Sequence, residues 1–419
     1  MEKSEARLIA TLESPALETE RTNWWIRDRM RFEGEDLIFA GQRVEDLAKR
    51  HDGRVMMYDG QRIRSQIALL KGALNRTGQP NRLYYAVKAN RFGGILGAVR
   101  DTGVVGIDCC SPGEVRLALS AGFAPEEISF TGCSVSEEDI EFLVDLPIRI
   151  NVNSISMIHK IGWYGNGRAI GLRLNPQLGV GASPGLTYAG PQATKFGIYP
   201  DRIEEAVRLA DSYGLVIEGV HMHVGSGWLR EGTPRFLAAM ERMVELAAGI
   251  GKPLKYVNVG GGLGVVHGPD DKPVDLDTYA HGVATTVRRY LGADVEICCE
   301  PGDFLVNDCA VIAATVTEVE EKGGLLFVGL NIGFNANPQA AHYGFVPELV
   351  HAHRGPTPSD ARCHVVTGNI NEVIDVFNPA APLPNVKEGD VLAILNVGGY
   401  SSSMRSAHCL RDLPVEIML

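Results

Sequence analysis

Residues 82–89 read RLYYAVKA, a short apolar run with a lysine near its end. It belongs to a long region in which apolar runs and helical stretches alternate. From about Val55 to Gly302, runs of this kind alternate with amphipathic stretches of helical periodicity. The eight runs, in chain order, are RLYYAVKA, VGIDCC, EISFTG, IRINVN, IGLRLN, IEGVHMHVG, YVNVGGG and VEICCEPG. Eight strands separated by helices over about 250 residues are typical of a (β/α)8 TIM-type barrel, which we predict here.

The segments between the runs have the features of helices. Residues 112–122 (PGEVRLALSAG) and 200–214 (PDRIEEAVRLADSYG) place apolar side chains three and four residues apart, and a Pro or Gly marks their ends. After Gly302, β-rich runs separated by Pro and Gly clusters replace this pattern. They predict a C-terminal, mostly antiparallel β domain. The runs are Val311–Glu318, Leu325–Gly329, Cys363–Thr367 and Val391–Val397.

This change of pattern divides the chain into three parts. We expect an N-terminal extension over residues 1–54 that partly joins the β domain, a barrel over residues 55–305, and the β domain over residues 306–419. A chain of 419 residues is too long for one compact core, which agrees with this division.

The composition argues against several classes of protein. The formal net charge of −11 disfavours binding to the phosphate backbone of a nucleic acid. No stretch approaches the ~20 apolar residues of a membrane helix, and the acidic start does not resemble a secretory signal. The eight cysteines show no CxxC and no ligand spacing. We therefore expect free thiols, no metal site and a cytoplasmic protein.

In a barrel of this type, chemistry is carried by residues at the carboxyl ends of the strands. Lys88 ends the first run, where its side chain would project into the mouth of the barrel. Partial burial lowers the pKa of a lysine amine, which then forms Schiff bases with carbonyl compounds. The alternative for Lys88 taken alone is a strand-end lysine that reaches water.

Two glycine-containing segments also end strands. Gly260–Gly264 (GGGLG) would let backbone amides approach a phosphate, and the alternative is a tight turn from strand to helix. Residues 221–227 (HMHVGSG) carry two histidines, of which we expect one to face the barrel interior and the other to face the helices. The inward imidazole would stack on a flat ring, and Ser226 would donate to a phosphate. The alternative is a core histidine whose hydrogen bonds are satisfied.

Glu300 follows the last run, where its carboxylate would be buried and would need a cation. A protonated pyridine nitrogen would provide one, and the alternative is an ion pair with Arg173. A Schiff-base lysine, a ring-stacking imidazole, a phosphate cradle and a carboxylate for a ring nitrogen together describe the partners of pyridoxal 5'-phosphate (PLP).

Eight motifs in order along the chain carry a resemblance to a known family. They are YYAVKAN (84–90), DCCSPGE (108–114), LRLNP (172–176), TKFGI (194–198), HVGSG (223–227), GGGLG (260–264), EPG (300–302) and GGY (398–400). The sequence resembles the fold-type III PLP-dependent decarboxylases, the group of diaminopimelate, ornithine and arginine decarboxylases, whose barrel is alanine racemase-like. The resemblance covers most of the chain from about residue 55; it is specific for the family and says little about the substrate.

The resemblance implies a role for each matching residue. Lys88 would carry the cofactor as a Schiff base, His223 would stack on its ring, and Glu300 would bond the ring nitrogen and keep it protonated. The cofactor phosphate would be held by Ser226, Gly261, Gly262 and Tyr400.

The resemblance also implies an assembly. Members of the family are homodimers in which the β domain of one subunit completes the active site of the other. Tyr343, Asn371 and Glu372 would be the residues supplied across that interface.

Four departures from the family pattern fall at expected site positions. Asp303 stands where the family has an arginine after EPG, and Gln339 stands where an arginine is expected four residues before Tyr343. Asn371 occupies the position of the cysteine that returns a proton to the product carbanion, and an amide cannot supply a proton. His408–Cys409 replaces a tyrosine–asparagine pair near the end of the chain.

These features predict an enzyme that releases CO2 from the α-carbon of an amino acid. Glu300 favours decarboxylation over racemisation, because alanine racemase pairs its ring nitrogen with an arginine. The loss of two arginines argues against a distal carboxylate on the substrate. Asp303 and Glu372 would suit a basic side chain, with Gln339 and Tyr343 as further substrate contacts.

Several alternatives stay open at this point. The substrate is a basic amino acid, an unusual biosynthetic amino acid or diaminopimelate itself. Two alternatives to a decarboxylase are a PLP-dependent racemase and an inactive paralogue that binds a partner protein. The proton donor is Lys88, His223 or a water molecule held by Asn371.

Overall fold

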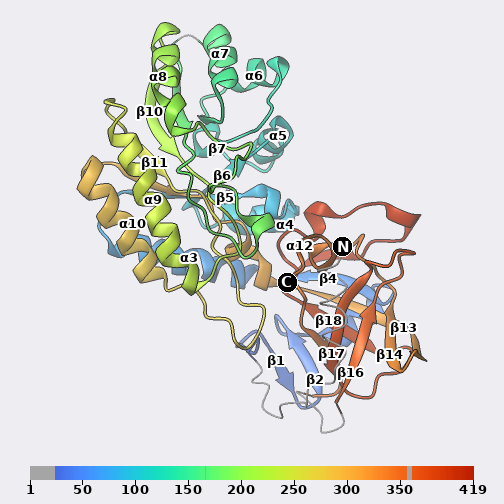
Figure 1. Ribbon diagram of the computed structural model, residues 1–419. Coiled ribbons are helices and arrows are strands. Elements are labelled where there is room, and N and C mark those ends of the chain that lie inside the picture. The colour runs from blue at the N-terminus through green and yellow to red at the C-terminus, as the bar shows by residue number, and fades with distance from the viewer. Residues whose placement is uncertain (1–23, 166, 356–360) are drawn as a thin grey trace. The chain divides into compact units, whose positions relative to one another are not determined.

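The computed structural model describes residues 24–165, 167–355 and 361–419 and divides the chain into two compact units (Figure 1). One unit comprises Ile63–Val265 and Lys272–Leu305. The other comprises the described residues up to Arg62, Val266–Asp271 and Val306–Leu419. We refer to them below as the barrel unit and the β unit.

The barrel unit contains a closed barrel of parallel strands, which confirms the predicted TIM-type fold. The strands are β5 (Asn81–Ala86), β6 (Val105–Cys109), β7 (Ile128–Phe130), β8 (Arg149–Val152), β9 (Ala169–Arg173), β10 (Val216–His221), β11 (Tyr256–Asn258) and β12 (Glu296–Cys299). The barrel closes where β12 pairs with β5, with Ile297 opposite Asn81. Each strand overlaps one of the eight apolar runs, because strands covered on both faces need nearly continuous apolar residues.

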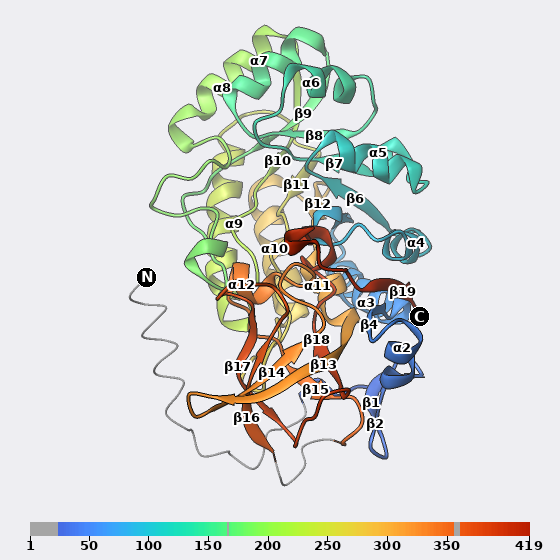
Figure 2. The ribbon, with the colours of Figure 1, turned by 90° about the vertical axis from the view of Figure 1, so that its right-hand side faces the viewer.

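Helices follow the strands and lie around the outside of the barrel (Figure 2). They are α3 (Gly60–Arg76), α4 (Gly93–Arg100), α5 (Pro112–Ser120), α6 (Glu137–Val144), α7 (Ile155–Tyr164), α8 (Ile203–Ser212), α9 (Thr233–Ala248) and α10 (Leu276–Leu291). Several begin at a side-chain cap. Ser111 accepts the Glu114 N–H at the start of α5, and Ser136 with Asp139 forms a capping box at the start of α6. Such caps satisfy N–H groups that have no partner within the helix.

The amino-terminal end of the barrel is filled by a layer built around Tyr256. Its hydroxyl donates to Asn151 Oδ1 at 2.9 Å, and the Arg149 guanidinium lies 4.0 Å from the centre of its ring. A Cβ atom at Gly219 or at Gly171 would collide with the Tyr256 side chain. Two glycines on neighbouring strands therefore make the space that this tyrosine fills.

The β unit is mostly antiparallel, as predicted. The order of strands in its sheet is β15 (Leu349–His351), β18 (Val391–Leu395), β13 (Ala310–Lys322), β14 (Leu325–Leu330), β16 (Arg362–Thr367) and β17 (Val376–Leu383). Strand β4 (Arg54–Tyr58) also pairs with β13, and β19 (Val415–Met418) pairs with β4. The pairs β14–β16 and β4–β19 are parallel. A small antiparallel sheet of β1 (Met30–Glu33), β2 (Asp36–Phe39) and β3 (Gln42–Arg43) leads into helix α2 (Val44–Arg50).

Strand β4 places residues 55–62 in the β unit, although the sequence division assigned them to the barrel. In register, Val55 pairs with Ala313 of β13 and with Val415 of β19. Two short helices complete the described elements, α11 (Asp303–Val306) and α12 (Gln339–Tyr343). Among the described residues, no helix combines the length and the hydropathy that crossing a membrane requires.

Candidate active site at the carboxyl end of the barrel

Lys88 lies in a single 3-10 turn, Val87–Ala89, that directly follows β5. Its Nζ atom is 3.5 Å from Oδ2 of Asp108, the penultimate residue of the neighbouring strand β6. The Lys88 side chain is 38% exposed, whereas that of Asp108 is 2% exposed. The amine is therefore held over a buried carboxylate and can still be reached by a small molecule.

Asp108 was not among the predicted site residues, although it begins the quoted motif DCCSPGE. Burial raises the pKa of this carboxyl group, the negative charge of Glu300 raises it further, and Lys88 opposes both effects. Its Oδ1 atom is buried and has no hydrogen-bond partner within the described residues. Strand ends from β6 and β12 thus bring two carboxyl groups and one amine into the same electrostatic environment.

Glu300 directly follows β12, and its carboxylate accepts two hydrogen bonds. Asn258 Nδ2 donates to Oε1 at 2.7 Å, and His221 Nε2 lies 3.0 Å from Oε2. Burial alone would raise the pKa of Glu300, but the interaction with His221 and the charge of Lys88 outweigh it, so the pKa is lowered. The group is therefore a buried carboxylate that stays ionised.

The ion pair with Arg173, which the sequence left open for Glu300, is not the contact that the structure shows. Arg173 Nη1 donates instead to Asn153 Oδ1 at 3.1 Å, and its guanidinium lies 4.6 Å from the centre of the Phe196 ring. Asn258 and His221 are the partners that sequence reasoning missed. Both end strands next to or near β12, and strand-end position was the available signal.

The prediction that the two histidines face opposite sides was wrong. Residues two apart in extended chain point the same way, because side chains alternate with a period of two. His221 is buried and His223 is half-buried, both near Lys88 and Glu300. In both cases burial lowers the pKa of the imidazole, with Lys88 acting in the same direction. His221 holds Glu300, while His223 Nδ1 is buried without a hydrogen-bond partner within the described residues.

Two glycine-containing loops pack backbone against backbone beside these residues. Trp228 N donates to Gly262 O at 3.2 Å, and Gly264 N donates to Trp228 O at 2.9 Å. Gly262 has φ +104°, and a Cβ atom there would collide with the carbonyl oxygen of Gly225. Only glycine allows this approach.

Two of the amide groups at this loop make no hydrogen bond within the part of the chain that the structure describes. Within the described residues, the N–H groups of Gly261 and Gly262 donate to no protein acceptor. The indole Nε1 of Trp228 is likewise buried without a partner, and it would lie 2.8 Å from a Cβ atom at Gly262. Ser226, which is half-buried, belongs to the facing loop. These donors form a cradle suited to an anion such as a phosphate.

Five predicted site residues lie in the β unit. Tyr400 has a left-handed backbone (φ +55°) and packs edge-on against the ring of Tyr343, with 6.1 Å between ring centres. Gln339 is buried, and its Nε2 donates to Gly399 O and to Asn307 Oδ1. It therefore holds the turn that carries Tyr400, a structural role that the sequence did not predict.

Asn371 and Glu372 lie in an exposed loop between β16 and β17. His408 reaches this loop from the C-terminal segment, with its Nε2 atom 3.4 Å from Oε1 of Glu372. Asp303, in contrast, belongs to the barrel unit, where it begins α11 three residues after Glu300.

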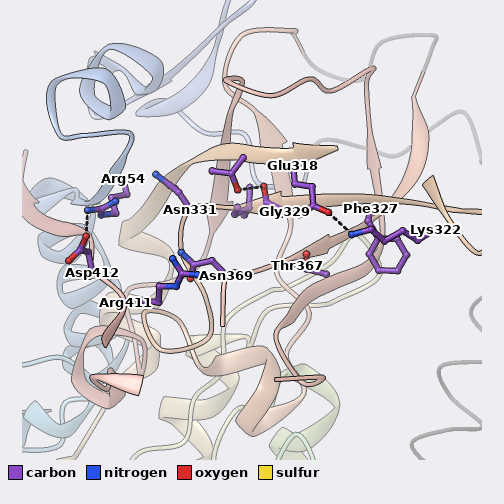
Figure 3. A pocket seen from close by; sticks show the side chains of 13 residues that line it. Arg54, Glu318, Lys322, Phe327, Gly329, Asn331, Thr367, Asn369, Arg411 and Asp412 are labelled. Carbon is purple, nitrogen blue, oxygen red and sulfur yellow. Dashed lines mark hydrogen bonds and ion pairs between the residues drawn. The ribbon is translucent and has the colours of Figure 1, made fainter. Parts of the chain in front are cut away.

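The β unit also contains a polar cavity of about 460 Å³ (Figure 3). Its charged side chains are largely paired with one another, Arg54 with Asp412 and Lys322 with Glu318, as the dashed lines show. None of the predicted site residues lines it.

The groups at the carboxyl end of the barrel fit PLP. A reachable lysine amine matches its aldehyde, an ionised buried carboxylate matches a protonated ring nitrogen, and unused glycine amides match its phosphate. The half-buried His223 imidazole, whose Nδ1 has no hydrogen-bond partner in the described part of the chain, offers a flat ring next to them.

Comparison with known proteins decides the family. Residues 61–307 match the family described as pyridoxal-dependent decarboxylase, pyridoxal binding domain. The chain belongs to the pyridoxal-dependent decarboxylases. The protein is thus a PLP-dependent enzyme that decarboxylates an amino acid, as the motifs predicted.

Relatives of this decarboxylase extend over nearly the whole chain. Diaminopimelate decarboxylase of Methanothermobacter thermautotrophicus is 32% identical over 91% of this chain and 90% of its own length. The Escherichia coli enzyme of the same name is 32% identical over 87% of this chain and 88% of its own. A solved structure, Helicobacter pylori diaminopimelate decarboxylase complexed with L-lysine, is 29% identical with a TM-score of 0.82, over 90% of this chain and 93% of that one.

Proposed function

We propose that this decarboxylase acts on an amino acid with a cationic side chain, at an active site to which two copies of the chain contribute. The observation that carries the reaction type is the ionised, buried Glu300 with its two hydrogen-bond donors. A fixed negative charge at this position favours a protonated ring nitrogen, which decarboxylation needs.

Each barrel residue has one task in this proposal. When bound, PLP supplies an electron sink for the electron pair that stays on the α-carbon as CO2 leaves. Lys88 would hold the cofactor covalently, and Glu300 would keep a proton on the ring nitrogen. The amides of Gly261 and Gly262 and the hydroxyl of Ser226 would bind the phosphate.

His221 and Asn258 act through Glu300. By donating one hydrogen bond to each oxygen, they fix the plane of the carboxylate and keep it from rotating. His223 would stack on the cofactor ring, as the resemblance implies. Because burial lowers the pKa of His223, its imidazole is neutral and does not repel a protonated ring beside it. The assignment of Tyr400 to the phosphate stays a prediction.

The substrate proposal rests on Asp303. A carboxylate three residues after Glu300 attracts a substrate ammonium and repels a distal carboxylate. Gln339 is buried among protein partners and is not carried over as a substrate contact. A second candidate, diaminopimelate, is favoured by the 32% identity to enzymes of that name over about nine-tenths of the chain.

A substrate panel distinguishes the two candidates. The rate of CO2 release is measured for lysine, ornithine, arginine, diaminopimelate and glutamate, with the Lys88→Ala variant as the blank. We expect a basic amino acid to be preferred, and we expect Asp303→Arg to weaken that preference. A clear preference of the unaltered enzyme for diaminopimelate would replace the first candidate with the second.

We further propose a homodimer in which Tyr343, Asn371 and Glu372 reach the partner's site. Two consecutive exposed apolar side chains that directly follow Glu372 support it, since Val373 is 92% exposed and Ile374 is 53% exposed. The eight cysteines are all free, which supports a cytoplasmic location.

A further inference from the structure

The loop that carries Asn371 and Glu372 is tightly anchored although its tip is exposed. Asp375 accepts the N–H groups of Ile370 at 2.6 Å and Phe334 at 2.7 Å. A Cβ atom at Gly368 would collide with the Asp375 carboxylate, so glycine makes room for it. The loop therefore presents its exposed side chains in a fixed position.

His408 meets this loop from a separate part of the chain. Its Nε2 atom is 3.4 Å from Glu372 Oε1, and the Phe334 ring lies 5.7 Å from its own ring. The same Phe334 is held by Asp375, so one anchor positions both members of the pair. The side chains of His408 and Glu372 are 43% and 50% exposed, which leaves the imidazole accessible.

An imidazole held by a carboxylate is a competent proton donor. The carboxylate orients the ring through one nitrogen, which leaves the other nitrogen to transfer a proton. Glu372 contacts Nε2, so Nδ1 is the atom that remains for proton transfer.

We infer that His408, paired with Glu372, returns the proton to the substrate α-carbon, a step that the Asn371 amide cannot perform. This rests on the proposed function, because it places the pair at the partner's active site. The step is balanced: the bond from the α-carbon to CO2 breaks and leaves its electron pair on carbon. That pair then takes the proton from His408 Nδ1, and water reprotonates the imidazole.

The other donors are less suited. His223 is half-buried, and burial together with Lys88 and Arg173 keeps the pKa of its imidazole well below the usual value, so the ring is neutral and a poor acid. Cys409 is adjacent and exposed, but within the described residues no carboxylate or ring contacts it. It serves as the matched rival in the experiment.

The experiment measures where the proton goes. If the α-carbon is not protonated, the proton is added to the cofactor instead, which yields an aldehyde and the pyridoxamine form of the cofactor. The ratio of that product to the correct amine is measured spectroscopically and by product analysis. We expect His408→Gln to raise the ratio by about 100-fold, the usual effect of one general acid. Glu372→Gln should raise it less, because the imidazole remains.

Controls separate proton delivery from folding. His353→Gln removes another half-exposed histidine of the β unit that is paired with a carboxylate, Asp36, and should leave the ratio unchanged. Asn371→Cys in the His408→Gln background should restore the correct amine by supplying a thiol.

Three outcomes are decisive. An unchanged ratio in a folded His408→Gln variant would overturn the inference, and so would a raised ratio in Cys409→Ala alone. If the unaltered enzyme released no CO2 from any amino acid, the proposed function would fail first, which is a different result.

Discussion

Replacing Glu300 with glutamine removes the negative charge of the side chain and keeps its shape, so the substitution tests the role of the charge alone. The carboxylate accepts Asn258 Nδ2 at 2.7 Å and His221 Nε2 at 3.0 Å. A glutamine keeps the first bond through its carbonyl oxygen but turns an NH2 group toward His221. The His221 Nδ1 atom is buried and has no hydrogen-bond partner among the described residues, so the ring proton can move there and leave Nε2 as the acceptor.

The magnitudes follow from this rearrangement. Because both hydrogen bonds survive the tautomer change, we expect the free energy of unfolding to fall by only about 1 kcal/mol. The decarboxylation rate should fall much further, by about 100- to 1,000-fold, because a preorganised charge at the reacting centre is lost.

The assay combines three measurements on Glu300→Gln. Borohydride trapping gives the amount of bound PLP, single-turnover CO2 release gives the rate, and thermal unfolding gives the stability. Glu296→Gln is the matched control, since Glu296 lies on the same strand but pairs with Arg149 at the opposite end of the barrel. A nearly normal rate in Glu300→Gln with full cofactor would refute the electron-sink argument.

Three further predictions test other parts of the site. Lys88→Ala should lose covalent PLP, and peptide mapping after borohydride reduction should label Lys88; a label on another lysine would show that the assignment is wrong. Mixing inactive Lys88→Ala with impaired Glu372→Ala should give more activity than the two variants give separately, through hybrid dimers, and no gain despite verified subunit exchange would argue against a shared site. Gly262→Ala should weaken PLP binding measured by titration, because the new Cβ collides with Gly225 O, and it should destabilise the protein by about 1–3 kcal/mol from backbone strain alone. Unchanged affinity and stability would remove the cradle from the phosphate site.

The barrel could be predicted from the sequence because buried parallel strands are recognisable as nearly continuous apolar runs. Lys88 and Glu300 stood out for the same reason, as polar residues at the ends of such runs. Strand β4 was harder, because Arg54–Tyr58 reads as one more apolar run. Its partners are β13 and β19, and β13 lies more than 200 residues away in sequence, a pairing that no local pattern reveals.

The hydrogen-bond partners of the site residues could not be predicted from the sequence either. Which residue binds Glu300 depends on how closure of the barrel brings β10, β11 and β12 together, so Arg173 was as good a candidate as His221. The pairing of His408 with Glu372 depends in the same way on two loops that the tertiary fold brings into contact. Sequence spacing can identify such residues individually, but it does not predict which of them are in contact.

The Tyr256 layer has an evolutionary consequence. Gly171, Gly219 and Tyr256 share one volume, so a larger residue at Gly219 requires a smaller one at 256, and a larger residue at Gly171 requires room at 256 and at Asn151. The three positions should therefore change together among related sequences, independently of substrate. Because the layer lies at the end of the barrel away from Lys88, such exchanges would let the barrel drift in sequence without altering its chemistry.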